Sequence, residues 1–159
     1  MIQVKRRNSK VKVSVVVPVY NTRDYLRQCL DSIICQSLHD IQIICIDDGS
    51  DDGSKEILES YADLDDRIIV LTQEHRFAGT ARNLGIDHAV GEYLVFWDSD
   101  DYFEQNALEK MYEKIEVTQS DICVCSGRRF YENEELEVET DAFLFVGRTP
   151  SESVFDRYS

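Results

Sequence analysis

The sequence lacks a long hydrophobic run, and this absence excludes a helix that crosses a membrane. None of its apolar stretches approaches the roughly 18 consecutive apolar residues that such a helix needs. Segment 1–12 is basic and polar, and it lacks the apolar core of a secretory signal. We therefore expect the protein in the cytoplasm or at the inner face of the membrane, with peripheral contact made by parts beyond this chain.

Basic residues are scarce relative to acidic ones. The chain has 17 lysines and arginines against 31 aspartates and glutamates, which gives a formal net charge of −14. Nucleic-acid-binding proteins present basic patches to the phosphate backbone, so we expect no nucleic acid as partner. Much of the acidity lies in segments 63–66 and 132–139, where a solvated face is the usual explanation.

Proline is nearly absent, and no segment has the composition of a linker. The two prolines are Pro18 and Pro150. Hydrophobic residues make up 43% of the chain and charged residues 30%, close to the averages of soluble globular proteins. Because 159 residues fit a single core, we predict one domain.

The cysteines are odd in number and lie in apolar runs, which is typical of buried free thiols in a reducing compartment. A zinc site at Cys123 and Cys125 would need two further ligands at matching spacing. None of the three histidines is placed to supply them, so we expect no zinc site. The five cysteines are Cys29, Cys35, Cys45, Cys123 and Cys125.

Apolar runs of strand length alternate with longer helical patterns, and this alternation is typical of a mainly parallel sheet flanked by helices. We therefore predict an α/β fold with a Rossmann-like sheet. The expected strands are residues 13–19, 41–46, 67–71, 92–97 and 121–125. The expected helices are 22–37, where Thr22 is the candidate cap, a helix through 57–61, then 80–90 and about 105–118.

The regular pattern fades after residue 127. Residues 143–146 have the composition of a strand, whereas 132–139 carries too many like charges to pack without partners. We therefore divide the chain into an N-terminal extension (1–11), an α/β domain (12–127) and an irregular or incomplete region (128–159).

Polar residues follow three of the predicted strands. They are Tyr20-Asn21, Asp47-Asp48 and Asp98-Ser99-Asp100. In open parallel sheets, ligands bind beyond the carboxyl ends of the strands. We therefore expect an aromatic face, a pair of carboxylates and a second acidic cluster at one edge of the sheet.

The acidic cluster after the fourth strand suits a divalent cation. Asp98 and Asp100 are separated by one small residue, and carboxylates so close repel one another unless a cation neutralises them. Oxygen ligands favour Mg²⁺ or Mn²⁺, which often complete their shells with substrate phosphates. The competing interpretation is that Asp100 or Asp101 caps the following helix.

Two other residues have equally ordinary alternatives. Asp48 could accept hydrogen bonds from a nucleobase, but Asp, Gly and Ser are also the commonest turn residues. Tyr20 could stack on a base, but core packing is the default for such a ring.

In order and spacing, four segments resemble the inverting glycosyltransferase family two, whose members share the GT-A fold. The resemblance spans about residues 12–125. Because four motifs occur in the family's order, the probability of a chance match is very small. The segments are Val17-Pro18-Val19-Tyr20-Asn21, then 47–54 (DDGSDDGS), 79–85 (GTARNLG) and 91–101 (GEYLVFWDSDD).

The resemblance implies that this chain holds a nucleotide-sugar donor, most often a uridine one. Pro18, Val19, Tyr20, Asn21 and Asp48 would lie at the nucleotide, with Pro18, Tyr20 and Asp48 lining the base pocket. Asp98 and Ser99 would lie against the ribose and diphosphate, and Asp100 of the D-x-D motif would bind Mn²⁺ or Mg²⁺. Arg82 would either contact phosphate or pair with loop acids as a structural tie.

Two departures from the family pattern stand out. Residues 74–77 read Glu-His-Arg-Phe where the family usually has Asn or a similar residue, and we expect His75 to be a surface loop residue. The family's general base, an Asp often preceded by Glu, is missing, because no Glu-Asp dipeptide occurs. Asp121, Asp141 and Asp156 remain, and nothing nominates one of them. We infer that the chain stops before the acceptor-binding half, so that 128–159 begins the acceptor side.

The expected function is therefore metal-dependent transfer of a sugar from a nucleotide sugar to a carbohydrate or lipid-linked acceptor, with inversion, in polysaccharide or glycoconjugate synthesis. One alternative is a sugar nucleotidyltransferase, although no glycine-rich basic loop follows the first strand. Another is a non-catalytic nucleotide-binding module. Dinucleotide-binding and P-loop proteins are excluded, because neither G-x-G-x-x-G nor G-x-x-x-x-G-K occurs. The donor sugar, the acceptor and the oligomeric state stay open.

Overall fold

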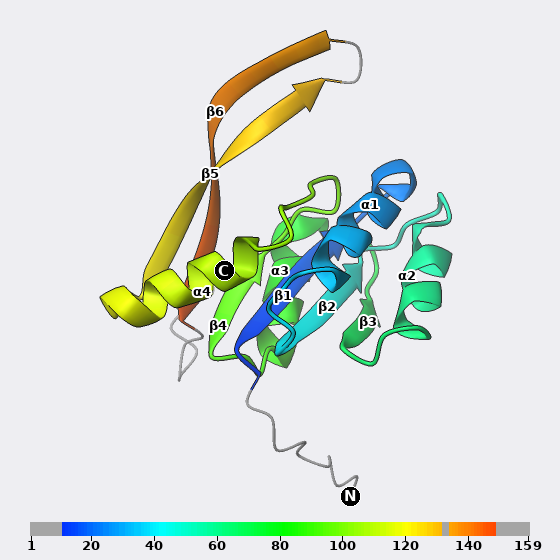
Figure 1. The fold of residues 1–159 in the computed structure, drawn as a ribbon. Helices are drawn as coiled ribbons and strands as arrows, with labels where there is room; N and C mark the ends of the chain where they lie inside the picture. The colour runs from blue at the N-terminus through cyan, green and yellow to red at the C-terminus, as the bar shows by residue number, and fades with distance from the viewer. Residues whose placement is uncertain (1–10, 132–133, 149–159) are drawn as a thin grey trace, which may run out of the picture.

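The computed structural model describes residues 11–131 and 134–148, with side chains up to residue 125. These residues form one six-stranded sheet with the strand order β3-β2-β1-β4-β6-β5, and helices cover both of its faces (Figure 1). The predicted α/β class with a mainly parallel sheet is therefore confirmed. The predicted N-terminal extension lies outside the described residues except for Val11.

Four parallel strands form the larger part of the sheet. They are β1 (Val13–Val19), β2 (Ile41–Asp47), β3 (Ile68–Thr72) and β4 (Tyr93–Phe96). β1 lies between β2 and β4 and is hydrogen-bonded in parallel to both. Every residue of β1 and β2 is buried, because helices cover both faces, and this explains their nearly continuous apolar sequence.

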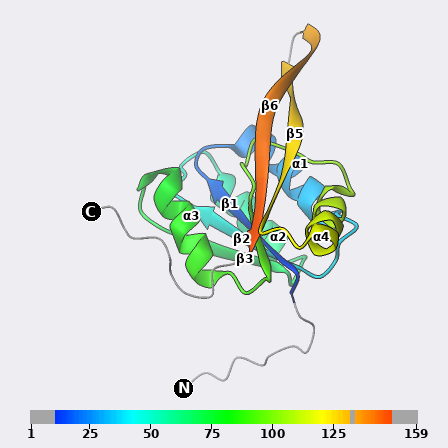
Figure 2. The same ribbon diagram turned by 90° about the vertical axis from the view of Figure 1, so that its left-hand side faces the viewer.

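The helices are divided between the two faces of the sheet, as Figure 2 shows edge-on. On one face, β1 residues such as Val15 and Val17 pack in a core with Leu30 and Leu108. On the other face, Val16 packs in a second core with Ala81. The first face carries α1 (Arg23–Ile34), α2 (Ser54–Ala62) and α4 (Ala107–Thr118), and the second carries α3 (Phe77–His88).

The sheet ends in a long antiparallel pair, β5 (Ile122–Tyr131) and β6 (Glu134–Arg148). β6 is antiparallel to both β4 and β5, so β5 runs in the same direction as the four parallel strands. The far part of the pair projects beyond the helices in Figure 1. The predicted boundary at residue 127 falls inside β5, which extends well past the predicted 121–125.

The sequence predicts that segment 132–139 cannot pack without partners, and its described part has a partner strand. β6 begins at Glu134, and the register places Arg128 opposite Glu139 and Arg129 opposite Val138. The acidic segment therefore has partners that a local count of charges does not show.

The cysteines follow the prediction in part. Cys29 and Cys45 are buried, and burial raises the pKa of the Cys45 thiol to about 12 and that of Cys29 still further. Cys123 and Cys125 are half-buried against the core, whereas Cys35 is exposed. The prediction of a buried thiol is therefore wrong for Cys35, which lies just after the last residue of α1.

Candidate functional site

The three polar strand ends meet at one edge of the sheet, as predicted. β1 lies between β2 and β4, so Tyr20 and Asn21 lie between the acids that follow β2 and those that follow β4. The backbone amide of Asp48 donates to the Val19 carbonyl oxygen (2.8 Å). Two strand spacings separate the ends of β2 and β4, about 10 Å. One elongated ligand can therefore reach both acidic segments.

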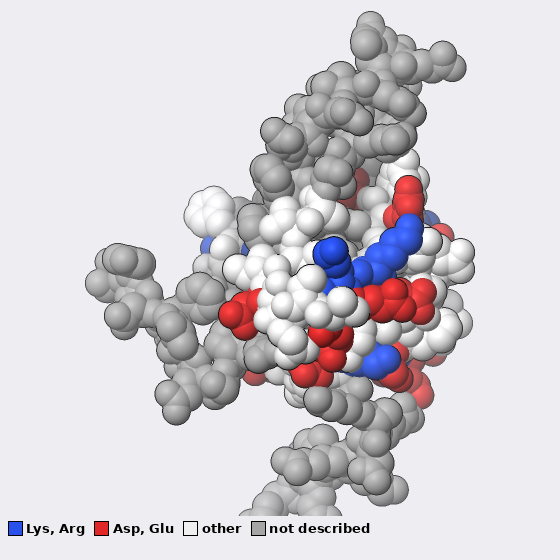
Figure 3. All heavy atoms as spheres, turned by 60° about the vertical axis from the view of Figure 1, so that its left-hand side comes forward, with Lys and Arg blue, Asp and Glu red and all other residues white. Residues whose placement is uncertain are grey.

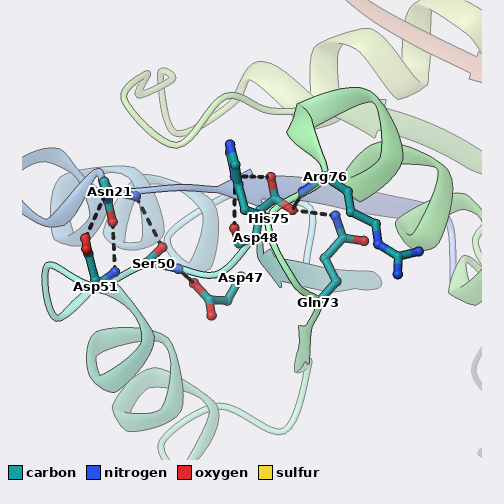
Figure 4. Close-up of polar contacts among 8 residues, drawn as sticks. All are labelled: Asn21, Asp47, Asp48, Ser50, Asp51, Gln73, His75 and Arg76. Atoms are coloured by element: carbon teal, nitrogen blue, oxygen red, sulfur yellow. Dashed lines mark hydrogen bonds and ion pairs between the residues drawn. The ribbon is translucent and has the colours of Figure 1, made fainter.

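Asn21 ties the loop after β1 to the loop after β2 (Figure 4). Its side-chain amide donates to Asp51 Oδ1 (2.9 Å), and the Asp51 amide donates back to Asn21 Oδ1 (3.0 Å). Its own backbone amide donates to Ser50 Oγ (3.2 Å). Asn21 has a φ of 51°, a left-handed conformation that asparagine tolerates better than most residues. The side chain of Asn21 therefore shapes the edge of the site.

The first turn of α1 is held by the same acidic loop. The backbone amide of Arg23 donates to Asp52 Oδ2 (2.9 Å), and that of Thr22 donates to Ser54 Oγ (3.2 Å). Thr22 occupies the cap position, but the prediction that its side chain caps the helix is wrong. Its hydroxyl instead donates to Ser99 Oγ (3.0 Å) and links the loops after β1 and β4.

Asp48 is buried, and its carboxylate is fully engaged (Figure 4). Oδ1 accepts from Gln73 Nε2 (2.6 Å) and from the Arg76 amide (2.8 Å), and Oδ2 lies 3.0 Å from His75 Nδ1. Burial alone raises the pKa of Asp48. The hydrogen bonds from Gln73, Arg76 and Phe77, with the charge of His75, outweigh burial and hold the pKa below its usual value. Asp48 is therefore an ionised buried carboxylate.

The lowered pKa of Asp48 predicts a dependence of stability on pH. A carboxyl group with a lowered folded-state pKa stabilises the fold above its unfolded pKa of about 4, and this contribution is lost as pH falls through the folded value. We expect the free energy of unfolding to fall below pH ~4, and to fall less steeply in Asp48→Asn. Urea unfolding at several pH values measures both slopes. Equal slopes in the two proteins would contradict the assignment.

Tyr20, His75 and Phe77 form an aromatic cluster beside Asp48. The rings of Tyr20 and His75 are stacked, with centroids 4.0 Å apart and planes inclined by 24°. Phe77 lies 5.0 Å from His75, is 73% exposed and has a φ of 68°. The prediction that His75 lies in a loop is confirmed, but its two contacts were not anticipated. The departure at residues 74–77 was the one indication in the sequence.

Asp47 follows the ordinary interpretation of its loop. Its side chain is buried, and Oδ1 accepts from the backbone amide of Ser50 three residues on (3.1 Å), so the side chain closes the loop on itself. Gly49, with a φ of 79°, makes the tight turn possible. Asp47 therefore builds the loop, and Asp48 is the acid that the loop presents.

The acids after β4 crowd together at the other side of the edge. Arg82 donates to Asp98 Oδ1 at 2.6 Å, and both side chains are partly exposed. Asp100 and Asp101 are exposed. Burial raises the pKa of Asp101, and the charges of Asp100 and Asp98 raise it further. The interpretation of Asp100 or Asp101 as a helix cap is wrong, because α4 begins at Ala107 with Asn106 as its cap.

The acidic cluster fits a cation that shares its shell with a phosphate. The negative charges of Asp98, Asp100 and Asp101 repel one another, and a divalent cation would reduce this repulsion. Among the described residues, however, no three acidic, histidine or cysteine side chains are already arranged around one point. Mg²⁺-type ions are commonly held by one or two carboxylates plus substrate phosphates, so the donor set fits this mode of binding and not a protein-only cage.

The predicted ligand-binding residues divide into accessible and buried ones. Tyr20, Asn21, Asp98 and Asp100 are exposed, and Arg82 is partly exposed. The side chains of Pro18, Val19, Asp48 and Ser99 are buried, and Oδ2 of Asp48 is covered by the more exposed His75. Contacts from the buried residues to a ligand would therefore go through their backbone atoms or follow a movement of His75.

No general base emerges from the described residues. Asp121 is exposed just before β5, at the amino edge of the parallel strands and therefore away from the carboxyl ends. Asp141 lies within β6, and Asp156 is outside the described residues.

The surface of the described part is mixed in charge. On the face shown in Figure 3, acidic and basic side chains lie next to one another, with apolar and uncharged surface between them. The excess of negative charge therefore does not form one continuous acidic surface on this face. In the part of the chain that the structure covers, no helix has the length and apolar character needed to traverse a bilayer.

Comparison with known proteins gives a consistent result. Residues 14–156 match the family described as glycosyl transferase family 2. The chain is 41% identical over 148 residues to the glycosyltransferase GlyA of Streptococcus pneumoniae serotype 4, covering 93% of this chain and 21% of that protein. It is 41% identical over 116 residues to a poly(ribitol-phosphate) beta-glucosyltransferase of Bacillus spizizenii, covering 70% of this chain and 18% of the relative.

Solved structures share the fold. S. aureus TarS 1–349 in complex with UDP superposes with a TM-score of 0.65 and 31% sequence identity, covering 70% of this chain and 34% of that one. The mannosyltransferase PcManGT of Pyrobaculum calidifontis, solved with GDP-Man and Mn²⁺, has a TM-score of 0.68 over 77% of this chain and 37% of its own. At 23% identity the second likeness concerns the fold alone.

The chain spans between 18% and 42% of the length of these curated relatives and others that it matches. The predicted GT-A-type fold is confirmed by the structural neighbours. Because the family match covers residues 14–156 of 159, the chain belongs to glycosyl transferase family 2.

Proposed function

We propose that this chain is the donor-binding part of a glycosyltransferase that moves a sugar from a UDP-sugar to the hydroxyl of a carbohydrate or lipid-linked acceptor. The observation that carries the proposal is the meeting of Tyr20, Asp48 and Asp100 at one edge of the sheet, in the loops that follow three adjacent parallel strands. The relative that acts on poly(ribitol-phosphate), and TarS in its complexes with UDP and UDP-GlcNAc, support a uridine donor and a role in glycan synthesis.

Four residues have distinct tasks in the proposed site. Tyr20 offers an aromatic face for the base, and Asp48 is an ionised acceptor for a base N–H group. The ion pair between Arg82 and Asp98 is exposed, so it stabilises the fold little and can open to give Arg82 to a phosphate. Asp100 would hold Mn²⁺ or Mg²⁺.

A bound cation supplies stabilisation of the negative charge that develops on the leaving nucleoside diphosphate. The side chains of this chain orient the donor. The hydrogen bonds of Asn21 and Thr22 connect the loops and so hold Tyr20 and the two acidic segments in fixed relative positions. We place the base that deprotonates the acceptor hydroxyl, and with it the inversion at the anomeric carbon, in a segment beyond this chain.

Calorimetry with UDP tests the donor site directly. We expect binding of UDP to the 159-residue chain with Mn²⁺ present and much weaker binding with EDTA. Binding that is equal with and without the cation would contradict the proposed diphosphate clamp. A chain that binds no UDP in either condition would be an inert scaffold with this fold.

Replacing Tyr20 with alanine is expected to weaken UDP binding about tenfold, because stacking on an aromatic ring contributes roughly 1–3 kcal/mol per base. Tyr20 is 45% exposed, so its loss should change the melting temperature little. The matched control is Tyr20→Phe, which keeps the ring and should keep the affinity. Calorimetry of the wild type, Tyr20→Ala and Tyr20→Phe measures the three affinities for UDP. An unchanged affinity in Tyr20→Ala would show that the base does not stack on Tyr20.

A further inference from the structure

The nucleobase part of the proposed donor site is already filled by a side chain of the protein. His75 stacks on Tyr20 with ring centroids 4.0 Å apart, and its Nδ1 lies 3.0 Å from Asp48 Oδ2. A base bound at this site would need the same two partners, the Tyr20 ring for stacking and the Asp48 carboxylate as acceptor. His75 therefore makes both contacts that a bound base is proposed to make.

Both carboxylate oxygens of Asp48 are engaged by the protein. Gln73 and the Arg76 amide occupy Oδ1, and Nδ1 of His75 faces both Oδ2 and the Asp48 carbonyl oxygen (3.2 Å). The Asp48 side chain is 3% exposed, whereas that of His75 is 39% exposed. Movement of His75 is thus the change that would open Asp48 with the least disturbance of buried structure.

The loop that carries His75 is suited to such a movement. His75 lies between β3 and α3, next to Arg76, which precedes the first residue of α3. Within the described part of the chain, its ring contacts Tyr20, Phe77 and Asp48, all of them at the carboxyl edge of the sheet. A change of side-chain rotamer can therefore release the imidazole while the strands stay in place.

We propose that His75 is an internal competitor of the nucleobase, a side chain that occupies the base site of the free protein and must leave before the donor binds. This inference rests on the proposed function, since it takes the Tyr20–Asp48 site as the base site. His75 then sets the affinity for the nucleotide: the apparent dissociation constant is the intrinsic one divided by the fraction of molecules in which the site is open.

The decisive variant is His75→Ala. If the imidazole fills the site in about nine-tenths of the free molecules, its removal tightens UDP binding about tenfold. His75→Phe keeps the ring but cannot donate to Asp48, so its affinity should fall between those of the wild type and His75→Ala. The matched control is His88→Ala, which removes a histidine at the last residue of α3 and should leave UDP affinity unchanged.

A double-mutant cycle with Tyr20 sharpens the test. In the wild type, Tyr20→Ala removes a stacking partner from the base and from its competitor at once, so the two losses partly cancel. In the His75→Ala background the base alone loses its partner. The effect of Tyr20→Ala on UDP affinity should therefore be larger in that background than in the wild type.

Calorimetry with UDP and Mn²⁺ on these variants, together with the imidazole NMR signals of the wild type, gives outcomes that can be told apart. Tighter binding by His75→Ala, and a shift of the His75 signals when UDP is added, are the expected results. Equal or weaker binding by His75→Ala, with the wild type binding UDP, would overturn the competitor and leave the donor site standing. Absence of UDP binding in both proteins would overturn the proposed function and the competitor with it.

Discussion

Replacing Asp100 with alanine is expected to remove most of the Mn²⁺-dependent affinity for UDP, a loss of about 30-fold or more. A cation that bridges a carboxylate and a diphosphate contributes several kcal/mol, and about 2 kcal/mol already corresponds to 30-fold. Asp98 forms an ion pair with Arg82, whereas Asp100, the other acid of the D-x-D segment, is exposed and forms no ion pair with a described residue. The variant should melt like the wild type, because Asp100 is exposed.

The effect of Asp100→Ala has two controls. Asp63→Ala removes the same charge from an exposed residue just after α2, at the opposite edge of the sheet, and should leave UDP affinity unchanged. Asp100→Asn keeps an oxygen ligand and should lie between the wild type and Asp100→Ala. Calorimetry of each variant in Mn²⁺ and in EDTA measures its affinity for UDP with and without the cation. A loss of affinity that is just as large in EDTA would show that Asp100 acts without the cation.

Replacing Gly85 with alanine is expected to destabilise the fold by about 3 kcal/mol, at the upper end of the cost of overpacking a core. Gly85 lies on α3 where the helix rests on β1. An added methyl group would lie 2.9 Å from Val16 Cγ2, closer still to Val16 Cγ1, and 3.1 Å from Ile46 Cδ1. Val16 and Ile46 are fully buried, so neither can move aside without disturbing the central strands.

The matched control for Gly85→Ala is Gly79→Ala, near the start of the same helix. No atom lies within 4 Å of a methyl group added at Gly79. Alanine is also the better helix former by about 1 kcal/mol, so this variant should be neutral or slightly more stable. Urea unfolding compares the two variants. If Gly85→Ala were as stable as Gly79→Ala, the close packing of α3 on β1 would be contradicted.

The parallel part of the fold could be predicted from the sequence, because its determinants are local. The β1 range 13–19 is predicted without error, and β2 and β3 are shifted by one residue or less at each end. Helix boundaries were less accurate. α3 begins at Phe77, three residues before its expected start, because the chain enters it through a positive φ at Phe77 that periodicity does not reveal.

The strand β6 could not be predicted beyond a short apolar stretch at 143–146. It pairs with β4 on one side and β5 on the other, over sequence separations that a local pattern does not contain. The acidic residues at its start indicate that this segment needs a partner, and the register places it opposite β5. The local sequence does not show which strand that partner is.

The site was predicted at the level of the backbone and missed at the level of side chains. Parallel strands fix where their carboxyl ends lie, and this brought Tyr20, Asp48 and Asp100 to one edge. The partners of those residues depend on loop conformation, as the contacts of His75 with Tyr20 and Asp48 show. The pairing of Arg82 with Asp98 is the exception, because pairing with the loop acids is one of the two roles that the family resemblance implies for Arg82.

The central claim is that a nucleotide and a cation bind together at the carboxyl edge of β1, β2 and β4. Paramagnetic broadening by Mn²⁺ in backbone amide NMR spectra, recorded with and without UDP, tests it most directly. The account predicts that UDP makes the broadening strong and selective for residues 98–101 and Arg82, and that the signals of Tyr20 and His75 shift at the same time. Broadening centred on the acidic segment 63–66, or unchanged by UDP, would contradict it.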